Sequence, residues 1–197
     1  MKLTYMASIL LLIITISVAG CCCCTGSQIT STPTIQPITN TIGLSKENPA
    51  PLGTTVTYTP KDWASSLYGS TYSITLEDVT KGENANDNML EKNSFEKPTS
   101  TTDDFLLAKF KITILSSTIS GESFKIYNYD FRATSHDGGR VFENNYWTYD
   151  PSIDGELYSG GTVEGWVCLE AAQDEQHPLI VFDRDYNGKD GVWFSTG

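Results

Sequence analysis

Alternating apolar and polar side chains run through the middle of this chain. In residues 105–116 every even position is apolar until the last, while lysine and threonine interrupt the odd positions. Successive side chains of a β-strand leave opposite faces, so this pattern predicts a half-buried strand. Residues 71–80 alternate in the same way and predict a second strand, with Tyr72, Ile74 and Leu76 on one face.

A change of phase marks residues 124–134. The apolar side chains occupy even positions from Phe124 and then odd positions from Tyr129. A shift of one residue turns every following side chain to the other face, so the chain needs a bulge or a crossing between sheets here. Such crossings occur at the corners of β-sandwiches.

The remaining apolar runs are short and are separated by turn residues. They predict further strands at residues 52–59, 140–143, 162–171, 179–182 and 192–194. Residues 81–103 are polar and predict a long loop. With seven to eight short strands and no strong helical period, the chain is expected to form an all-β, immunoglobulin-like antiparallel β-sandwich over residues 52–197.

The first fifty residues have a different character. Residues 1–20 combine Lys2 with a nearly continuous apolar run and small residues, which is the pattern of a secretory signal. The Val-Ala-Gly-Cys sequence ending at Cys21 resembles a prokaryotic lipobox, which makes Cys21 the expected lipidation site. Residues 21–51 begin with four cysteines and continue as a Thr/Ser/Pro-rich segment, which predicts a flexible tether.

Composition narrows the range of partners. The formal net charge is −11, so the phosphate backbone of a nucleic acid would be repelled. Of the five cysteines, only Cys168 lies in the predicted domain, so no intradomain disulfide is expected there. Its simplest role is that of a small buried apolar residue.

Several short pieces resemble one family of exported prokaryotic proteins, the domain of unknown function 4352. The strongest piece is Gly-Gly-Thr-Val-Glu-Gly-Trp-Val at residues 160–167, and Leu-Gly-Thr-Thr-Val at residues 52–56 also matches. The family is related in fold to an immunoprotective extracellular mycobacterial antigen. The resemblance implies an immunoglobulin-like sandwich behind a lipoprotein signal, and it supplies no catalytic residues.

One stretch resembles the first half of a calcium-binding loop. Asp183, Asp185 and Asn187 alternate before a glycine at the sixth position, and Asp190 offers a further oxygen ligand. The position that usually holds a glutamate is Phe194 instead. The alternative is a charged hairpin with no metal, and this alternative is preferred, so no cofactor is expected.

An aromatic group offers a second candidate site. Tyr146, Trp147 and Tyr149 lie close together in a predicted loop and could stack on a sugar ring. The alternative is that Trp147 folds back over the core, since large aromatic side chains are mostly buried.

Enzyme chemistry finds little support in the residues. The chain holds only two histidines, His136 in a glycine turn and His177 before a proline, and it lacks a Gly-x-Ser-x-Gly elbow. We therefore expect a non-enzymatic, lipid-anchored module on the extracytoplasmic face of the membrane, with a binding or structural role. Its partners would be the membrane, through the N-terminal lipid, and an envelope protein or glycan. The alternatives are a carbohydrate-binding module that uses the aromatic loop and an envelope hydrolase.

Overall fold

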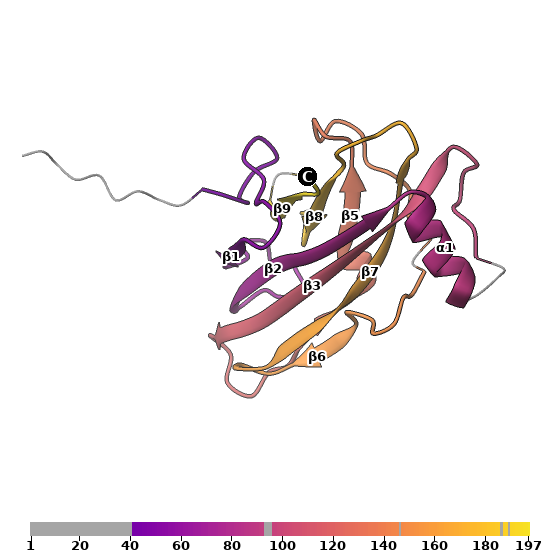
Figure 1. Cartoon of the computed structure of the whole chain (residues 1–197). Coiled ribbons are helices and arrows are strands. Elements are labelled where there is room, and N and C mark those ends of the chain that lie inside the picture. The colour runs from indigo at the N-terminus through magenta and orange to yellow at the C-terminus, as the bar shows by residue number, and fades with distance from the viewer. Residues whose placement is uncertain (1–40, 93–95, 146, 186, 189) are drawn as a thin grey trace, which may run out of the picture. The chain divides into compact units, whose positions relative to one another are not determined.

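The computed structural model describes residues 41–197, except residues 93–95, 146, 186 and 189 (Figure 1). The predicted signal segment, Cys21 and most of the predicted tether lie outside the described residues. The elements are β1 (Thr55–Tyr58), β2 (Ser70–Lys81), α1 (Glu83–Lys92), β3 (Asp103–Ser117), β4 (Phe124–Ile126), the 3-10 helix η1 (Asn128–Asp130), β5 (Phe131–Thr134), β6 (Gly155–Leu157), β7 (Thr162–Ala172), β8 (Leu179–Phe182) and β9 (Val192–Ser195).

The strands form antiparallel sheets in two layers. The larger sheet has the order β1-β2-β3-β7, and the second has the order β5-β8-β9. A two-stranded sheet, β4-β6, completes the set among the described residues. Figure 1 shows β2 and β3 running diagonally in front of β5, with β7 following β3. The predicted antiparallel β-sandwich is confirmed, although the described part holds nine strands and not seven or eight.

The predicted alternation places the core between the two layers. Tyr72, Ile74 and Leu76 of β2 are fully buried, as are the even-numbered apolar residues of β3. Phe110 of β3 meets the opposite sheet, with its ring centroid 4.7 Å from that of Phe131 and 5.2 Å from that of Phe194. The period-two pattern of β2 and β3 therefore marks the inner face of the larger sheet correctly.

The phase change at residues 124–134 is a crossing between sheets. β4 pairs with β6, η1 interrupts the extended backbone, and β5 then pairs with β8. Phe124 and Phe131 are both buried although their positions differ in phase. The short helix thus resets which side chains face the core.

Two local predictions are wrong. Residues 81–103 were expected to be a loop, but they contain α1, which buries Ala85 and Met89 one turn apart. Residues 140–143 were expected to be a strand, but they contribute only an isolated bridge from Val141 to Thr134. The helix is polar, and these two side chains on one face are too weak a signal to predict it.

Packing of the domain begins before the predicted boundary at Leu52. Ala50 is fully buried and forms a parallel bridge with Phe194 of β9. The backbone N–H of Ala50 donates to the carbonyl of Trp193 at 2.8 Å, and the N–H of Trp193 donates to the carbonyl of Gly43 at 2.8 Å. The last residues of the predicted tether therefore line the edge of β9.

A second cluster lies on the outer face of the large sheet. The cluster holds Phe105, Leu107 and Cys168 together with Ala85 and Met89 of α1, and β7 is buried on both faces from Val167 to Ala172. Burial raises the pKa of the Cys168 thiol far above its ordinary value, which keeps the thiol protonated. None of the helices in the described residues is long and apolar enough to span a membrane.

Candidate functional site

Three connections meet at one end of the sandwich and enclose a pocket. They are residues 59–69 between β1 and β2, η1 with the start of β5, and residues 183–191 between β8 and β9. The cavity has a volume of about 570 Å³, which suits a small molecule. Its lining is formed by Tyr58, Pro60, Lys61, Asp62, Ala64, Ser65, Ser66, Tyr129, Asp130, Arg132, Asp183, Arg184, Asp185 and Asp190.

Asp183 joins the three connections. Its carboxylate accepts a hydrogen bond from the Ser65 hydroxyl at 2.6 Å, and its backbone N–H donates to the carbonyl of Asp130 at 3.0 Å. Its φ of 54° lies in the left-handed region, which aspartate tolerates better than most residues. This conformation ends β8 and directs the carboxyl group toward Ser65 in the first loop.

Local hydrogen bonds shape the other two walls. The Asp62 carboxylate accepts from the N–H of Ala64 at 3.0 Å, which holds the first loop in a turn. The Asp130 carboxylate accepts from the N–H of Tyr127 at 2.9 Å at the start of η1. Gly191 returns the chain to β9 at a φ of 107°, where a Cβ would lie 2.7 Å from the carbonyl oxygen of Phe182.

Two carboxyl groups in the pocket have raised pKa values. Burial is the main cause for Asp183, whose pKa rises to about 7, and the neighbouring Asp130, Asp62 and Asp190 add to the effect. Burial likewise raises the pKa of Asp130 to about 6, against the opposing effects of the Tyr127 N–H and Arg132. Near neutral pH these two groups therefore exchange protons, which is unusual for aspartate.

A buried tyrosine lies behind the carboxyl groups. Tyr72 is fully buried, and its hydroxyl has no hydrogen-bond partner in the described structure. Burial raises the pKa of the Tyr72 hydroxyl well above its ordinary value, and the nearby Asp183, Tyr58 and Asp130 raise it further. Its ring packs edge-on against Tyr58 at 5.9 Å and Phe182 at 5.6 Å.

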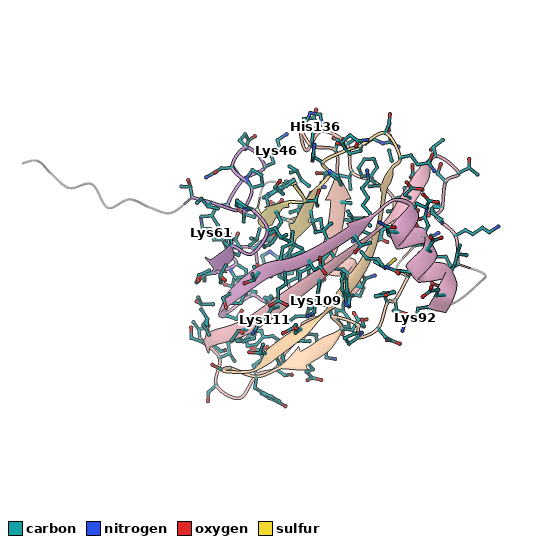
Figure 2. All side chains as sticks on the ribbon, viewed as in Figure 1. Lys46, Lys61, Lys92, Lys109, Lys111 and His136 are labelled. Atoms are coloured by element: carbon teal, nitrogen blue, oxygen red, sulfur yellow. The ribbon has the colours of Figure 1, made fainter. Side chains whose placement is uncertain are left out.

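Exposed aromatic residues belong to the same connections, and two of them, Trp63 and Tyr129, lie at the pocket. Trp63 stands between two residues that line the pocket, and 81% of it is exposed. Tyr129 lines the pocket, stacks on Tyr127 at 4.6 Å and is 48% exposed. Figure 2 shows Lys61 beside β1, on the opposite side of the view from Lys92 and α1.

The predicted calcium ligands are only partly brought together. Asp183, Asp185 and Asp190 line the pocket, whereas Asn187 is exposed and does not. The described residues contain no group of three or more His, Cys, Asp or Glu side chains placed to hold a metal ion. The segment connects the antiparallel strands β8 and β9, so it has the hairpin geometry that was the alternative to a calcium loop.

The predicted aromatic platform lies elsewhere. Trp147 and Tyr149 are partly buried and pack against the cluster under α1, and Tyr149 contacts Trp166 edge-on at 5.7 Å. The indole N–H of Trp147 is buried without a partner. Tyr146 lies outside the described residues. Packing against the core was the alternative for Trp147, and this contact agrees with it.

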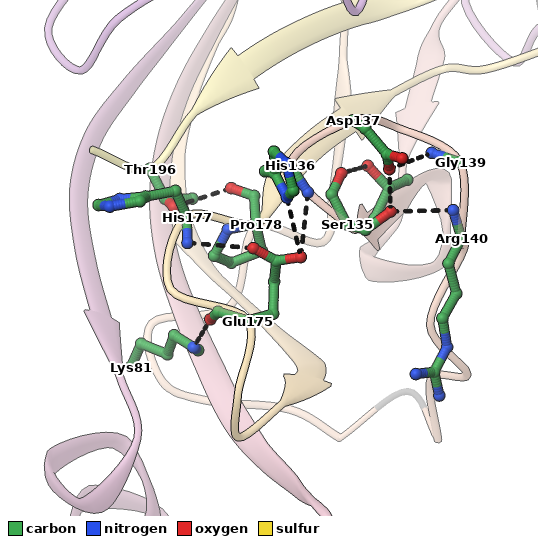
Figure 3. Close-up of polar contacts among 11 residues, drawn as sticks. Lys81, Ser135, His136, Asp137, Gly139, Arg140, Glu175, His177, Pro178 and Thr196 are labelled. Atoms are coloured by element: carbon green, nitrogen blue, oxygen red, sulfur yellow. Dashed lines mark hydrogen bonds and ion pairs between the residues drawn. The ribbon is translucent and has the colours of Figure 1, made fainter.

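The two histidines lie near one carboxylate, that of Glu175 (Figure 3), and neither lines the pocket. The Glu175 carboxylate accepts from the N–H of His177 at 3.3 Å and lies 3.5 Å from Nδ1 of His136. The neighbouring Ser135 hydroxyl donates to Asp137 at 2.5 Å and not to His136. The serine therefore lacks the base contact that nucleophilic catalysis needs.

Sequence reasoning named Asp183, Asp185 and Asp190 only as possible calcium ligands, and it missed the other residues of the pocket. Asp62 and Ser65 share one loop but lie far from Asp130 and Asp183 in the chain, and only the fold brings them together. The available signals were Trp63 inside a polar loop and Asp130 beside Phe131 at the phase change.

The fold and the pocket define an antiparallel β-sandwich with an acidic pocket at one end of its strands. No family model and no curated protein matches the chain, so membership in the domain of unknown function 4352 family stays a prediction.

Three solved structures are similar to the chain at low identity. The secreted protein MPT63 from Mycobacterium tuberculosis has 12% identity and a TM-score of 0.48, over 74% of this chain and 96% of that one. The yjhA protein from Bacillus subtilis has 14% identity and a TM-score of 0.39, with the same coverage. The ycdA protein from Bacillus subtilis subsp. subtilis strain 168 has 12% identity and a TM-score of 0.42, over 63% of this chain and 35% of that one.

Proposed function

We propose that this protein is a lipid-anchored, extracytoplasmic binding module whose binding site is the acidic pocket. The pocket itself carries the binding part of the proposal. Three connections from distant parts of the chain converge on one cavity of about 570 Å³, and two partly buried carboxyl groups line it. Concave sites with a few convergent polar groups and perturbed pKa values are where ligands bind.

The anchoring part of the proposal rests on the sequence. The apolar run before Cys21 and the small residues next to it are the features of a lipoprotein signal. Lipidation attaches more than one acyl chain, and two chains hold a protein on a membrane far more firmly than one. Residues 25–40 would then separate the described domain from the bilayer.

Replacing Cys21 with serine tests the anchor. In a bacterial host fed a radiolabelled fatty acid, the unchanged protein is expected to be labelled and to sediment with membranes. Cys21→Ser should abolish the label, and Cys24→Ser is the matched control that should keep it. Equal labelling of the unchanged protein and Cys21→Ser would exclude this anchor.

Replacing a pocket residue tests the binding role. A glycan and small-molecule panel is screened with the unchanged full-length protein in detergent, and every hit is repeated with Asp183→Asn. A hit that Asp183→Asn weakens and Asp174→Asn does not weaken supports the pocket. Hits that respond equally to both variants, or to neither, would place binding elsewhere.

An envelope hydrolase is the second candidate, and one observation favours it. Glycosidases use two carboxyl groups of which one is protonated near neutral pH, and Asp130 and Asp183 have pKa values of about 6 and about 7. Release of new reducing ends from purified cell-wall polysaccharide, lost in both Asp130→Asn and Asp183→Asn, would establish the activity. Binding without release leaves the binding module as the function.

A further inference from the structure

The size of the pocket distinguishes between a metal ion and a molecule. One water-sized occupant takes about 30 Å³, whereas this cavity offers about 570 Å³. Its aspartates come from three connections, and the described carboxylates do not converge tightly enough to form a metal-ligating group. An occupant of several non-hydrogen atoms therefore fits the cavity better than a bare cation.

The charge of the lining favours a positively charged occupant. Five aspartates line the pocket against three basic residues. The Arg132 guanidinium donates to the carbonyl oxygens of Tyr129 and Phe131, which occupies N–H donors but leaves its positive charge in place, so the carboxyl groups outnumber the basic groups by five to three. The protein as a whole carries a net charge of −11, which draws cations toward it and repels anions.

The polar and aromatic groups suit an ammonium group on a carbon chain. An ammonium has three N–H donors, which need acceptors such as the carboxylates of Asp183 and Asp130. The Tyr129 ring offers a face for an aliphatic chain and for a cation.

We infer that the pocket binds an alkylammonium group, a primary amine carried on a short aliphatic chain or ring, between Asp183, Asp130 and Tyr129. This inference rests on the proposed binding function and names its ligand class. The carboxylates neutralise the ammonium, and the ring covers the methylene groups next to it. A neutral polyol lacks the charge that the carboxylates select, and an anion is repelled.

The raised pKa values predict how the affinity depends on pH. Asp183 and Asp130 are protonated at low pH and become carboxylates as the pH passes their pKa values of about 7 and about 6. The other charged groups around them are Asp62, Asp185, Asp190, Lys61, Arg132 and Arg184 in the pocket lining, and Asp154 near Asp130. An ammonium binds the ionised form better, so its affinity should rise by roughly tenfold or more between about pH 5 and about pH 8.

Calorimetry with three matched probes tests the inference on the full-length protein in detergent at physiological ionic strength. The probes are putrescine, its uncharged analogue 1,4-butanediol and the anion succinate. Putrescine should bind with one site per chain, and the other two probes should give no binding heat. Asp183→Asn should weaken putrescine by about tenfold or more at about pH 8. Asp174→Asn, which removes the same charge from an exposed position, should leave the affinity within about twofold.

Each other outcome has a defined meaning. If butanediol binds as tightly as putrescine and Asp183→Asn weakens both, the pocket binds hydroxylated ligands: the ammonium inference fails while the binding module stands. If putrescine responds equally to Asp183→Asn and Asp174→Asn, its binding is a general effect of net charge and the inference is overturned. Absence of putrescine binding also overturns the inference. Whether the pocket binds any other ligand is then tested separately by the ligand panel with Asp183→Asn.

Discussion

The boundary between the core of the sandwich and the pocket falls within two pairs of consecutive residues. Phe131 and Phe182 are fully buried, with ring centroids 4.5 Å apart. Asp130 and Asp183, the residues next to them in the chain, line the pocket with partly buried carboxyl groups. On one side of each peptide bond, burial stabilises the fold; on the other, burial opposes ionisation. A protein shaped by stability alone would not collect such groups at one end of its strands.

The core side of the comparison predicts the largest effect. Phe110 is fully buried and contacts Phe131 and Phe194 of the opposite sheet. Phe110→Ala should lower the free energy of unfolding by about 3–5 kcal/mol, because it removes buried area and leaves a cavity. Urea unfolding followed by tryptophan fluorescence measures this. Leu115→Ala, on the same strand but 49% exposed, is the control and should change stability by less than about 0.5 kcal/mol. Similar small losses in both variants would contradict the two-layer core.

For the pocket, the comparison predicts that replacing a residue raises the free energy of unfolding. The pKa of Asp183 is about 7 in the folded protein and about 3.9 when unfolded, so the folded state holds this proton more tightly. Stability from this group is fully present below about pH 4 and is lost as the pH rises through about 7. Asp183→Asn stays neutral and avoids that loss, and asparagine tolerates the same left-handed backbone.

Asp183→Asn should therefore raise the free energy of unfolding at about pH 8 by about 2–4 kcal/mol and have little effect near pH 4. Urea unfolding at several pH values measures the difference, with Asp174→Asn as the control that should show no such trend. A variant that loses stability at about pH 8 would show that the carboxylate stabilises the fold, which would remove the contrast between pocket and core.

The same contrast explains what the sequence could predict. Alternation in β2 and β3 shows directly which side chains face the core, because a strand has a period of two. Asp130 and Asp183 carry no such signal, since their role depends on which strand ends the fold brings together. α1 was missed because it buries only Ala85 and Met89, and its other side chains are typical of a loop. The sequence correctly drew attention to the aromatic residues around Trp147, but Trp147 packs on the cluster beneath α1.

Two tryptophans give the smallest and most direct test of the comparison. Trp147 is partly buried against the cluster under α1, whereas Trp63 is 81% exposed beside the pocket. Trp147→Ala should cost about 2 kcal/mol of stability, less than a fully buried aromatic residue, because the lost packing is partly offset by removal of its unpaired buried N–H. Trp63→Ala should cost less than about 0.5 kcal/mol. Thermal unfolding of both variants, with the ligand panel repeated on each, measures the two roles together. Unchanged melting of Trp147→Ala with loss of ligand binding would instead restore the aromatic platform as the site and move the function away from the acidic pocket.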